Sequence, residues 1–208
     1  MLKKLVINTL KAAGYEIHRS PRAIPPVAQV APKYSKIHYG SGRVYLDGWL
    51  NVDIIANGPE NYMYVNLVER HPFPDNSFTF AFSEDFIEHV DQASAMMFLV
   101  EAYRTLAPGG VLRITTPDLD KVLTKHYRKQ DFSGFEVGRE EAYSSSSHIH
   151  FFSKGTLRAV AAHIGFDTHF VEGDRSKYPE LDGINTRSDE VYLHAELVKP
   201  IHGRMSKP

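Results

Sequence analysis

Residues Ser35–Gly42 read SKIHYGSG, and this short segment indicates the fold of the chain that follows it. Its first part, Ser35 to Tyr39, predicts a short strand, and Gly40-Ser41-Gly42 follows that strand directly. Two glycines permit a tight turn and let a ligand approach the backbone without meeting a Cβ atom. The same pattern is typical of an ordinary strand-exit turn, so the turn alone leaves a binding role and a structural role open.

Strand-like and helix-like segments alternate downstream of this turn. The apolar patterning predicts strands at Leu50–Ile54, Tyr62–Asn66, Ser77–Phe82, Val111–Thr115, Thr168–Glu172 and Val191–Val198, and helices at Asp91–Leu106, Leu119–His126 and Ser153–Ile164. Residues 130–147 are polar and predict a loop. The alternation predicts an α/β fold, a Rossmann-like, doubly wound, mostly parallel sheet with helices on both faces and an antiparallel late strand. Ligands of such sheets bind beyond the carboxyl ends of the strands.

The composition is that of an ordinary globular protein. The chain has 208 residues, with 42% hydrophobic and 24% charged residues, which excludes a disordered chain or a fibre. A formal net charge of −1 provides no strong nucleic-acid signal. The absence of cysteine excludes disulfides and a thiolate nucleophile, and it fits a cytoplasmic location. Because no stretch of 18 apolar residues occurs, we expect no transmembrane segment.

The N-terminal part, residues 1–33, differs from the remainder, 34–208. Residues 1–19 predict an amphipathic helix, and residues 20–33 contain four prolines and predict an extended arm. The helix either docks on the domain or makes a weak membrane or protein contact, and the sequence leaves both possibilities open. Its apolar core is too short for a secretory signal.

Asp53 stands near the end of the second predicted strand. A carboxylate there can accept hydrogen bonds from both hydroxyls of a ribose bound across the glycine turn, although a solvated strand-end aspartate would look the same. A dinucleotide fold would have a third glycine at the position of Tyr45, followed by a full crossover helix. Residues 43–49 are too few for that helix. The spacing therefore disfavours a nicotinamide or flavin site.

Five segments in this order resemble the class I S-adenosylmethionine-dependent methyltransferases, in particular the small Methyltransf_11-like members with a Gly-Trp turn. The segments are His38–Gly42, Gly48–Asp53, Pro72–Phe78, Ser83–Val90 and Glu101–Leu112. The resemblance implies that S-adenosylmethionine is the cofactor. It implies a cofactor-binding set made of Tyr39, Gly40, Ser41, Gly42, Asp53, Asn66, Leu67 and Ser83, in which the glycines pass beneath the methionine part, Asp53 holds the ribose, and Asn66 and Leu67 lie beside the adenine.

Three residues are candidate catalytic groups: Glu84, His89 and His148. Glu84 ends the fourth strand, and an imidazole such as that of His89 can act as a base near neutral pH. Glu88 and His89 could equally just open a helix. His148 and His150 would point to one side of an extended segment, but the sequence shows no further ligand nearby, so it predicts no metal site.

These features together predict S-adenosylmethionine-dependent methyl transfer to an unidentified acceptor. A small molecule, a glycan or a lipid is favoured over nucleic acid because the charge is balanced. Two alternatives stay open: a non-catalytic binding module on the same fold, and a nucleotide-sugar or dinucleotide enzyme. His38 and Asn66, which stand where the family often has acidic residues, and the short 43–49 link are the departures that keep the first alternative open.

Overall fold

A single seven-stranded sheet organises the chain. The computed structural model describes residues 28–55, 57–127, 132–144 and 146–201, so the expected N-terminal helix lies outside the described residues. The strand order is β3-β2-β1-β4-β5-β7-β6, and β7 runs antiparallel to both of its neighbours while the other pairs are parallel. The strands are β1 (Lys36–Tyr39), β2 (Leu50–Asp53), β3 (Tyr62–Tyr64), β4 (Phe78–Glu84), β5 (Leu106–Pro117), β6 (Asp167–Val171) and β7 (Tyr192–Val198). This confirms the predicted mostly parallel sheet with an antiparallel late strand.

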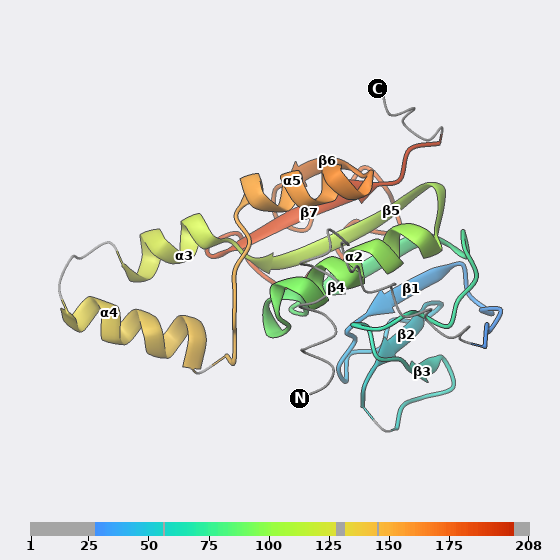
Figure 1. The fold of residues 1–208 in the computed structure, drawn as a ribbon, viewed down its shortest axis with the longest axis horizontal. Helices are drawn as coiled ribbons and strands as arrows, with labels where there is room; N and C mark the ends of the chain where they lie inside the picture. Colours follow the sequence, from blue (N-terminus) through green and yellow to red (C-terminus); the bar gives the residue numbers. More distant parts are fainter. Residues whose placement is uncertain (1–27, 56, 128–131, 145, 202–208) are drawn as a thin grey trace, which may run out of the picture.

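The helices are short. They are η1 (Ile87–His89), α2 (Gln92–Thr105), α3 (Leu119–His126), α4 (Phe132–Arg139), η2 (Glu140–Ser144) and α5 (Lys154–Ile164) (Figure 1). Asp91 caps α2 by accepting a hydrogen bond from the Ser94 backbone, and Ser153 caps α5 in the same way through Thr156. In the part of the chain that is described, no helix is long and apolar enough to cross a membrane.

Each face of the sheet has its own apolar cluster. The larger cluster includes Phe98 of α2 and Leu157 of α5, which pack over Tyr39, Leu112 and Leu197 of the sheet. The smaller cluster lies on the other face and contains Trp49, Phe82, Val111 and Leu181. Trp49 belongs to the turn before β2 and Leu181 to the connection between β6 and β7, so loops cover this second cluster.

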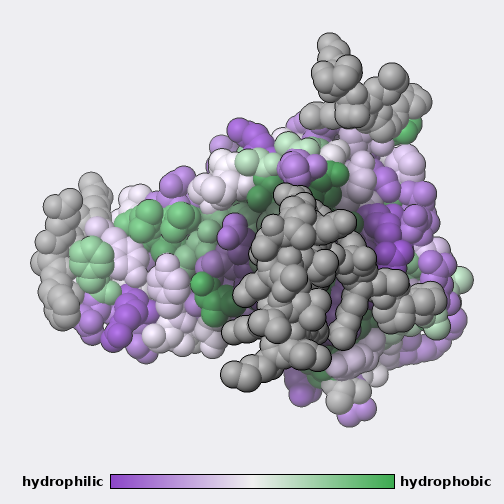
Figure 2. Space-filling view, viewed as in Figure 1, coloured by the Kyte–Doolittle hydropathy of each residue, from purple (hydrophilic) through white to green (hydrophobic). Residues whose placement is uncertain are grey.

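Residues 132–144 are helical, which corrects the prediction of a loop at 130–147. They form α4 and the π-helical η2. Gly138 lies so close to Tyr127 that a Cβ atom there would be 2.7 Å from the tyrosine ring, and Phe135 also contacts that ring, with centroids 5.2 Å apart. Glycine, which is a poor helix former, therefore permits close packing of α4 on the end of α3. The pair projects from one end of the sheet (Figure 1), where Figure 2 shows hydrophobic surface. Leu123 of α3 and Phe135 of α4 are among its exposed apolar side chains.

The turn between β1 and β2 is organised by the fully buried side chain of Asn51. Its amide nitrogen donates to the backbone oxygens of Leu46 and Trp49, at 3.1 and 3.2 Å. Its amide oxygen accepts from the Leu46 backbone nitrogen at 2.9 Å and from Nδ1 of His38 at 3.1 Å. One side chain thus satisfies backbone groups that a crossover helix would otherwise satisfy internally.

The connection between β6 and β7 is held by Arg113. This arginine is fully buried in β5 and forms an ion pair with Glu196 of β7, at 3.1 Å. The same nitrogen, Nη1, also donates to the backbone oxygen of Arg175 at 2.9 Å, and Nη2 donates to the backbone oxygen of Gly173 at 2.8 Å. The guanidinium therefore anchors the start of the loop that covers the smaller apolar cluster.

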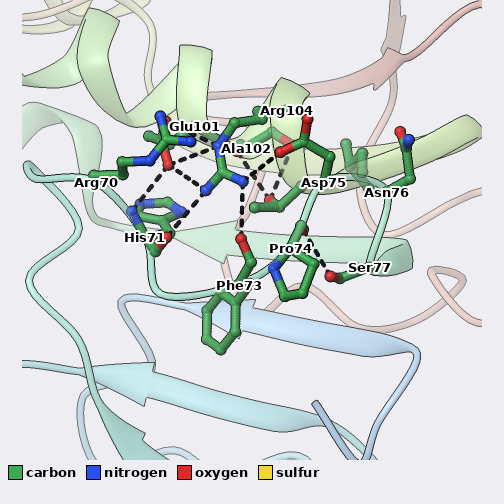
Figure 3. Close-up of polar contacts among 12 residues, drawn as sticks. Arg70, His71, Phe73, Pro74, Asp75, Asn76, Ser77, Glu101, Ala102 and Arg104 are labelled. Carbon is green, nitrogen blue, oxygen red and sulfur yellow. Dashed lines mark hydrogen bonds and ion pairs between the residues drawn. The ribbon is translucent and has the colours of Figure 1, made fainter. Parts of the chain in front are cut away.

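A second arginine, Arg104, joins α2 to the segment before β4 (Figure 3). Its guanidinium bonds Glu101 one turn earlier, at 2.6 Å, and Asp75, at 2.7 Å. It also donates to the backbone oxygens of His71 and Phe73, and Glu101 in turn accepts from the His71 backbone nitrogen at 2.9 Å. Glu101 is buried, so removal of Arg104 would leave its carboxylate with only a longer ion pair to Arg70, at 3.7 Å, and the hydrogen bond from His71.

We therefore expect Arg104→Ala to lower the free energy of unfolding by roughly 2–4 kcal/mol. Arg139→Ala is the matched control, because Arg139 pairs with Glu136 at the same helical spacing but in the open. That control should cost about 0.5 kcal/mol or less. Urea denaturation measures both values, and equal losses in the two variants would contradict the role assigned to Arg104.

The buried imidazole of His38 makes stability depend on pH. Burial lowers the pKa of His38 to about 4, while its hydrogen bond to Asn51 acts in the opposite direction. The folded state therefore excludes a proton that the unfolded chain binds below its ordinary pKa of about 6.5, so stability is lost as the pH falls from that value toward 4.

For His38 alone we expect a loss of about 2 kcal/mol between pH 7.5 and pH 5. His38→Gln should shrink the measured pH-dependent loss by that amount, whereas His169→Gln, at an exposed position of β6, should leave it unchanged. Urea unfolding at the two pH values is the measurement. An undiminished loss in His38→Gln would assign the acid sensitivity to other groups.

Candidate functional site

A cleft of about 430 Å³ opens at the carboxyl ends of β1, β2 and β4. This is the edge at which parallel α/β sheets bind ligands. The lining combines the glycine turn, acidic groups and an apolar floor, and it comprises Gly40, Gly42, Asp53, Ile54, Val65, Asn66, Leu67, Val68, Asp85, Phe86, His89 and Val90.

The glycine turn and Asp53 form one unit at the mouth of this cleft. The Gly42 backbone nitrogen donates to Oδ2 of Asp53 at 2.8 Å, and the Ile54 backbone nitrogen donates to Oδ1 at 2.6 Å. Two backbone donors thus fix the carboxylate, while each of its oxygens keeps a second lone pair for a ligand. The sequence predicts that Asp53 acts together with the glycine turn, and in the structure a hydrogen bond joins the two.

Gly40 and Gly42 require glycine for different physical reasons. Both have positive φ angles, 64° at Gly40 and 55° at Gly42. A Cβ atom at Gly40 would lie 3.0 Å from the Phe86 side chain, so this position also needs glycine for packing. A Cβ atom at Gly42 would meet nothing within 4 Å, because this position faces open space beside the cleft.

The other predicted cofactor residues fall into two groups. Asn66 and Leu67 line the cleft beside Asp53. The side chains of Tyr39, Ser41 and Ser83 are buried, and none of them lines it. The Tyr39 hydroxyl bonds Thr105 inside the core, at 3.0 Å.

Sequence analysis missed the apolar floor of the cleft, which is formed by Ile54, Val65, Val68, Phe86 and Val90. Ile54 and Val65 follow the carboxyl ends of β2 and β3 directly, and the other three lie a few residues beyond β3 or β4, so their place after the strand ends was the available signal. Phe86 is turned into the cleft by Asp85, which has a φ of 53°.

Glu84 lies apart from the other two catalytic candidates. Its carboxylate accepts a hydrogen bond from the Thr186 backbone nitrogen at 3.0 Å and one from the Thr186 hydroxyl, and it does not line the cleft. The neighbouring Asp85 forms an ion pair with Arg187. These contacts tie the loop before β7 to the end of β4.

His89 and His148 do come together, and Glu88 joins them. The two rings meet edge to face with centroids 4.9 Å apart, and Nε2 of His148 is 4.0 Å from Oε1 of Glu88. Burial raises the pKa of Glu88 to about 8. Burial, and next the charge of His89, lowers the pKa of His148. His89 is exposed to the cleft, whereas Glu88 lies beneath it, fully buried.

Comparison with known proteins bears on the fold. Residues 51–114, which run from β2 into β5, match the family model of a methyltransferase domain. The fold of the chain is that of S-adenosylmethionine-dependent methyltransferases of known structure. No curated protein sequence matches the chain.

Solved structures of other methyltransferases share the fold. A methyltransferase from Mesorhizobium loti is 18% identical, with a TM-score of 0.55 over 92% of this chain and 96% of that one. A possible histamine N-methyltransferase from Thermotoga maritima is 21% identical, with a TM-score of 0.52 over 81% and 83%. Phosphoethanolamine N-methyltransferase 2 from Haemonchus contortus, in complex with phosphomonomethylethanolamine and S-adenosylhomocysteine, is 16% identical, with a TM-score of 0.51 over 85% and 51%.

Proposed function

We propose that this chain binds S-adenosylmethionine in the cleft and transfers its methyl group to a small-molecule, glycan or lipid acceptor. The observation that carries the proposal is the unit formed by Gly42 and Asp53, in which an anchored carboxylate stands beside a backbone position with open space in front of it. A carboxylate held in this way can accept hydrogen bonds from the two hydroxyls of a ribose.

The remaining lining suits the other parts of this cofactor. The apolar floor, which includes Phe86, and the neighbouring Leu67 offer a surface for an adenine ring, and Asn66 offers an amide that can bond its edge. The Haemonchus contortus enzyme of the same fold was solved with S-adenosylhomocysteine, the product that methyl transfer leaves. That likeness supports the same cofactor here.

Methyl transfer requires little covalent chemistry from the protein. The acceptor lone pair attacks the methyl carbon, the bond from that carbon to sulfur breaks, and S-adenosylhomocysteine leaves. The rate depends mainly on holding acceptor and methyl group in line and on excluding water. His89, which faces the cleft, is placed to take a proton from an acceptor that must lose one.

Calorimetric titration with S-adenosylhomocysteine tests the site through Gly42→Val. We expect micromolar binding by the wild type, no binding of NAD⁺, and at least tenfold weaker binding of S-adenosylhomocysteine by the variant, because the valine side chain enters the open space beside the cleft. Absence of wild-type binding to a folded protein would contradict the proposal.

Gly48→Val is the matched control for this experiment. Gly48 has a φ of 75° and open space around its Cβ position, as Gly42 does, but it does not line the cleft. Both variants carry a backbone penalty of roughly 1–2 kcal/mol in stability. Only Gly42→Val should lose affinity, and an equal loss in both would point to backbone strain alone.

Asp53→Ala should weaken S-adenosylhomocysteine binding by roughly 1.5–3 kcal/mol, the usual range for hydrogen bonds to a charged group. Asp47→Ala, which removes an exposed carboxylate from the same β1–β2 connection, should leave the affinity unchanged. Calorimetry on both variants, with circular dichroism to verify folding, is the measurement. A change below about 0.5 kcal/mol in Asp53→Ala would remove the ribose role.

A further inference from the structure

We propose that Glu88, His89 and His148 bind a divalent transition-metal ion at the inner edge of the cleft. The binding of the ion stands independently of the proposed function. Only the role of the ion, described below, rests on it.

The three side chains form a compact set of ligands. Glu88 and His89 are neighbours in η1, and His148 comes from the segment that follows η2. One ligand atom from each lies within 4.8 Å of the other two, and Oε1 of Glu88 is 4.0 Å from Nε2 of His148. Ligand atoms of a tetrahedral zinc ion, with bonds near 2.1 Å, are about 3.4 Å apart. Small rotations of these side chains would therefore bring the three atoms to bonding distance.

A buried oxygen atom independently points to a missing cation. Glu88 is fully buried, and its Oε2 accepts a hydrogen bond from the Thr116 hydroxyl at 3.0 Å. Its Oε1 has no hydrogen-bond partner and lies on the side of His148. A buried carboxylate oxygen without a partner is costly, and a cation bound there would supply one. Thr116 would then orient the carboxylate from behind, as outer groups do in metal sites.

The backbone holds the two ligand-bearing segments together without an ion. The Ile149 backbone nitrogen donates to the Glu88 backbone oxygen at 2.9 Å, which joins the segment of His148 directly to η1. The His148 ring also meets Phe151 edge to face, with centroids 5.4 Å apart. The site therefore needs little ordering to bind its ion.

The ligand set selects the class of metal. Two imidazole nitrogens and one carboxylate oxygen form a common set for zinc, manganese, iron or cobalt. Magnesium and calcium prefer ligand sets made of oxygen atoms, so this site disfavours them. Three protein ligands leave at least one coordination position for another molecule.

Because of where the site lies, the open coordination position of the ion can bind a methyl acceptor. His89 lines the cofactor cleft, and His148 lines a neighbouring cavity of about 170 Å³ together with His126, Phe151 and Tyr192. With the ion bound, His89 is a ligand rather than a base, and an acceptor hydroxyl bound to the ion would release its proton to solvent more readily. Its oxygen would then attack the methyl carbon while the carbon–sulfur bond breaks, which leaves a methyl ether and S-adenosylhomocysteine. The ion therefore favours acceptors with an oxygen nucleophile.

The test is zinc binding by the full chain, made without a histidine tag and stripped with EDTA. Calorimetry with Zn²⁺ alone should show one equivalent bound with micromolar or tighter affinity, and Co²⁺ should give visible ligand-field absorption. Glu88→Gln and His148→Asn should each weaken Zn²⁺ binding at least tenfold. His150→Asn is the matched control, since this histidine lies on the same segment but outside the cluster, and its affinity should stay at the wild-type value.

Two results would overturn the site: absence of stoichiometric Zn²⁺ and Co²⁺ binding by the folded wild type, or binding that His148→Asn leaves unchanged. If Glu88→Gln fails to fold, His89→Asn takes its place. Titration of the metal-free protein with S-adenosylhomocysteine separates this outcome from the proposed function. Cofactor binding without zinc binding rejects the metal site alone, and zinc binding without cofactor binding rejects the proposed function alone.

Discussion

The hydrogen bonds of the Asn51 side chain are the constraint on which the cleft depends. The connection between β1 and β2 is too short for a helix, so its backbone groups need another partner, and Asn51 supplies it from a fully buried position. The turn that Asn51 fixes carries Gly42, and the strand that contains Asn51 ends in Asp53. Asn51 therefore helps to hold the turn and the carboxylate together although it does not line the cleft, and Asn61 bonds the same backbone oxygens of Leu46 and Trp49.

Arg104, which is half-buried, and Arg113, which is fully buried, hold longer segments in the same way. Arg104 fastens the segment before β4 to α2, and Arg113 fastens the segment after β6 to the sheet. In each case a guanidinium bonds backbone oxygens of an irregular segment and a buried carboxylate at once. A chain of this size can therefore keep long irregular connections packed against its sheet. The connection before β7 in turn reaches Glu84 at the end of β4 and Asp85, which lines the cleft.

The sheet was predictable from the sequence because its signals are local. The strand at Lys36–Tyr39, its glycine turn and the strand that ends at Asp53 each lie within a few residues, and their order carried the family resemblance. The α4 helix was not predictable from the sequence. Its packing depends on the contact of Gly138 with Tyr127, and a segment with two glycines and several polar residues looks like a loop. The cluster of Glu88, His89 and His148 was also beyond prediction. The sequence shows two of these residues side by side and the third far away, and only the fold brings them together.

The pairing of Arg113 with Glu196 has a consequence for the newly made chain. The two partners are 83 residues apart, and every strand of the sheet except β7 precedes Glu196 in the order of synthesis. Until β7 emerges from the ribosome, burial of Arg113 would place an unpaired charge in the interior, which is strongly unfavourable. The face of the sheet that carries Phe82 and Val111 must therefore stay open to water while most of the chain is already made. The smaller apolar cluster therefore closes after β7, the last strand of the described residues, has been made.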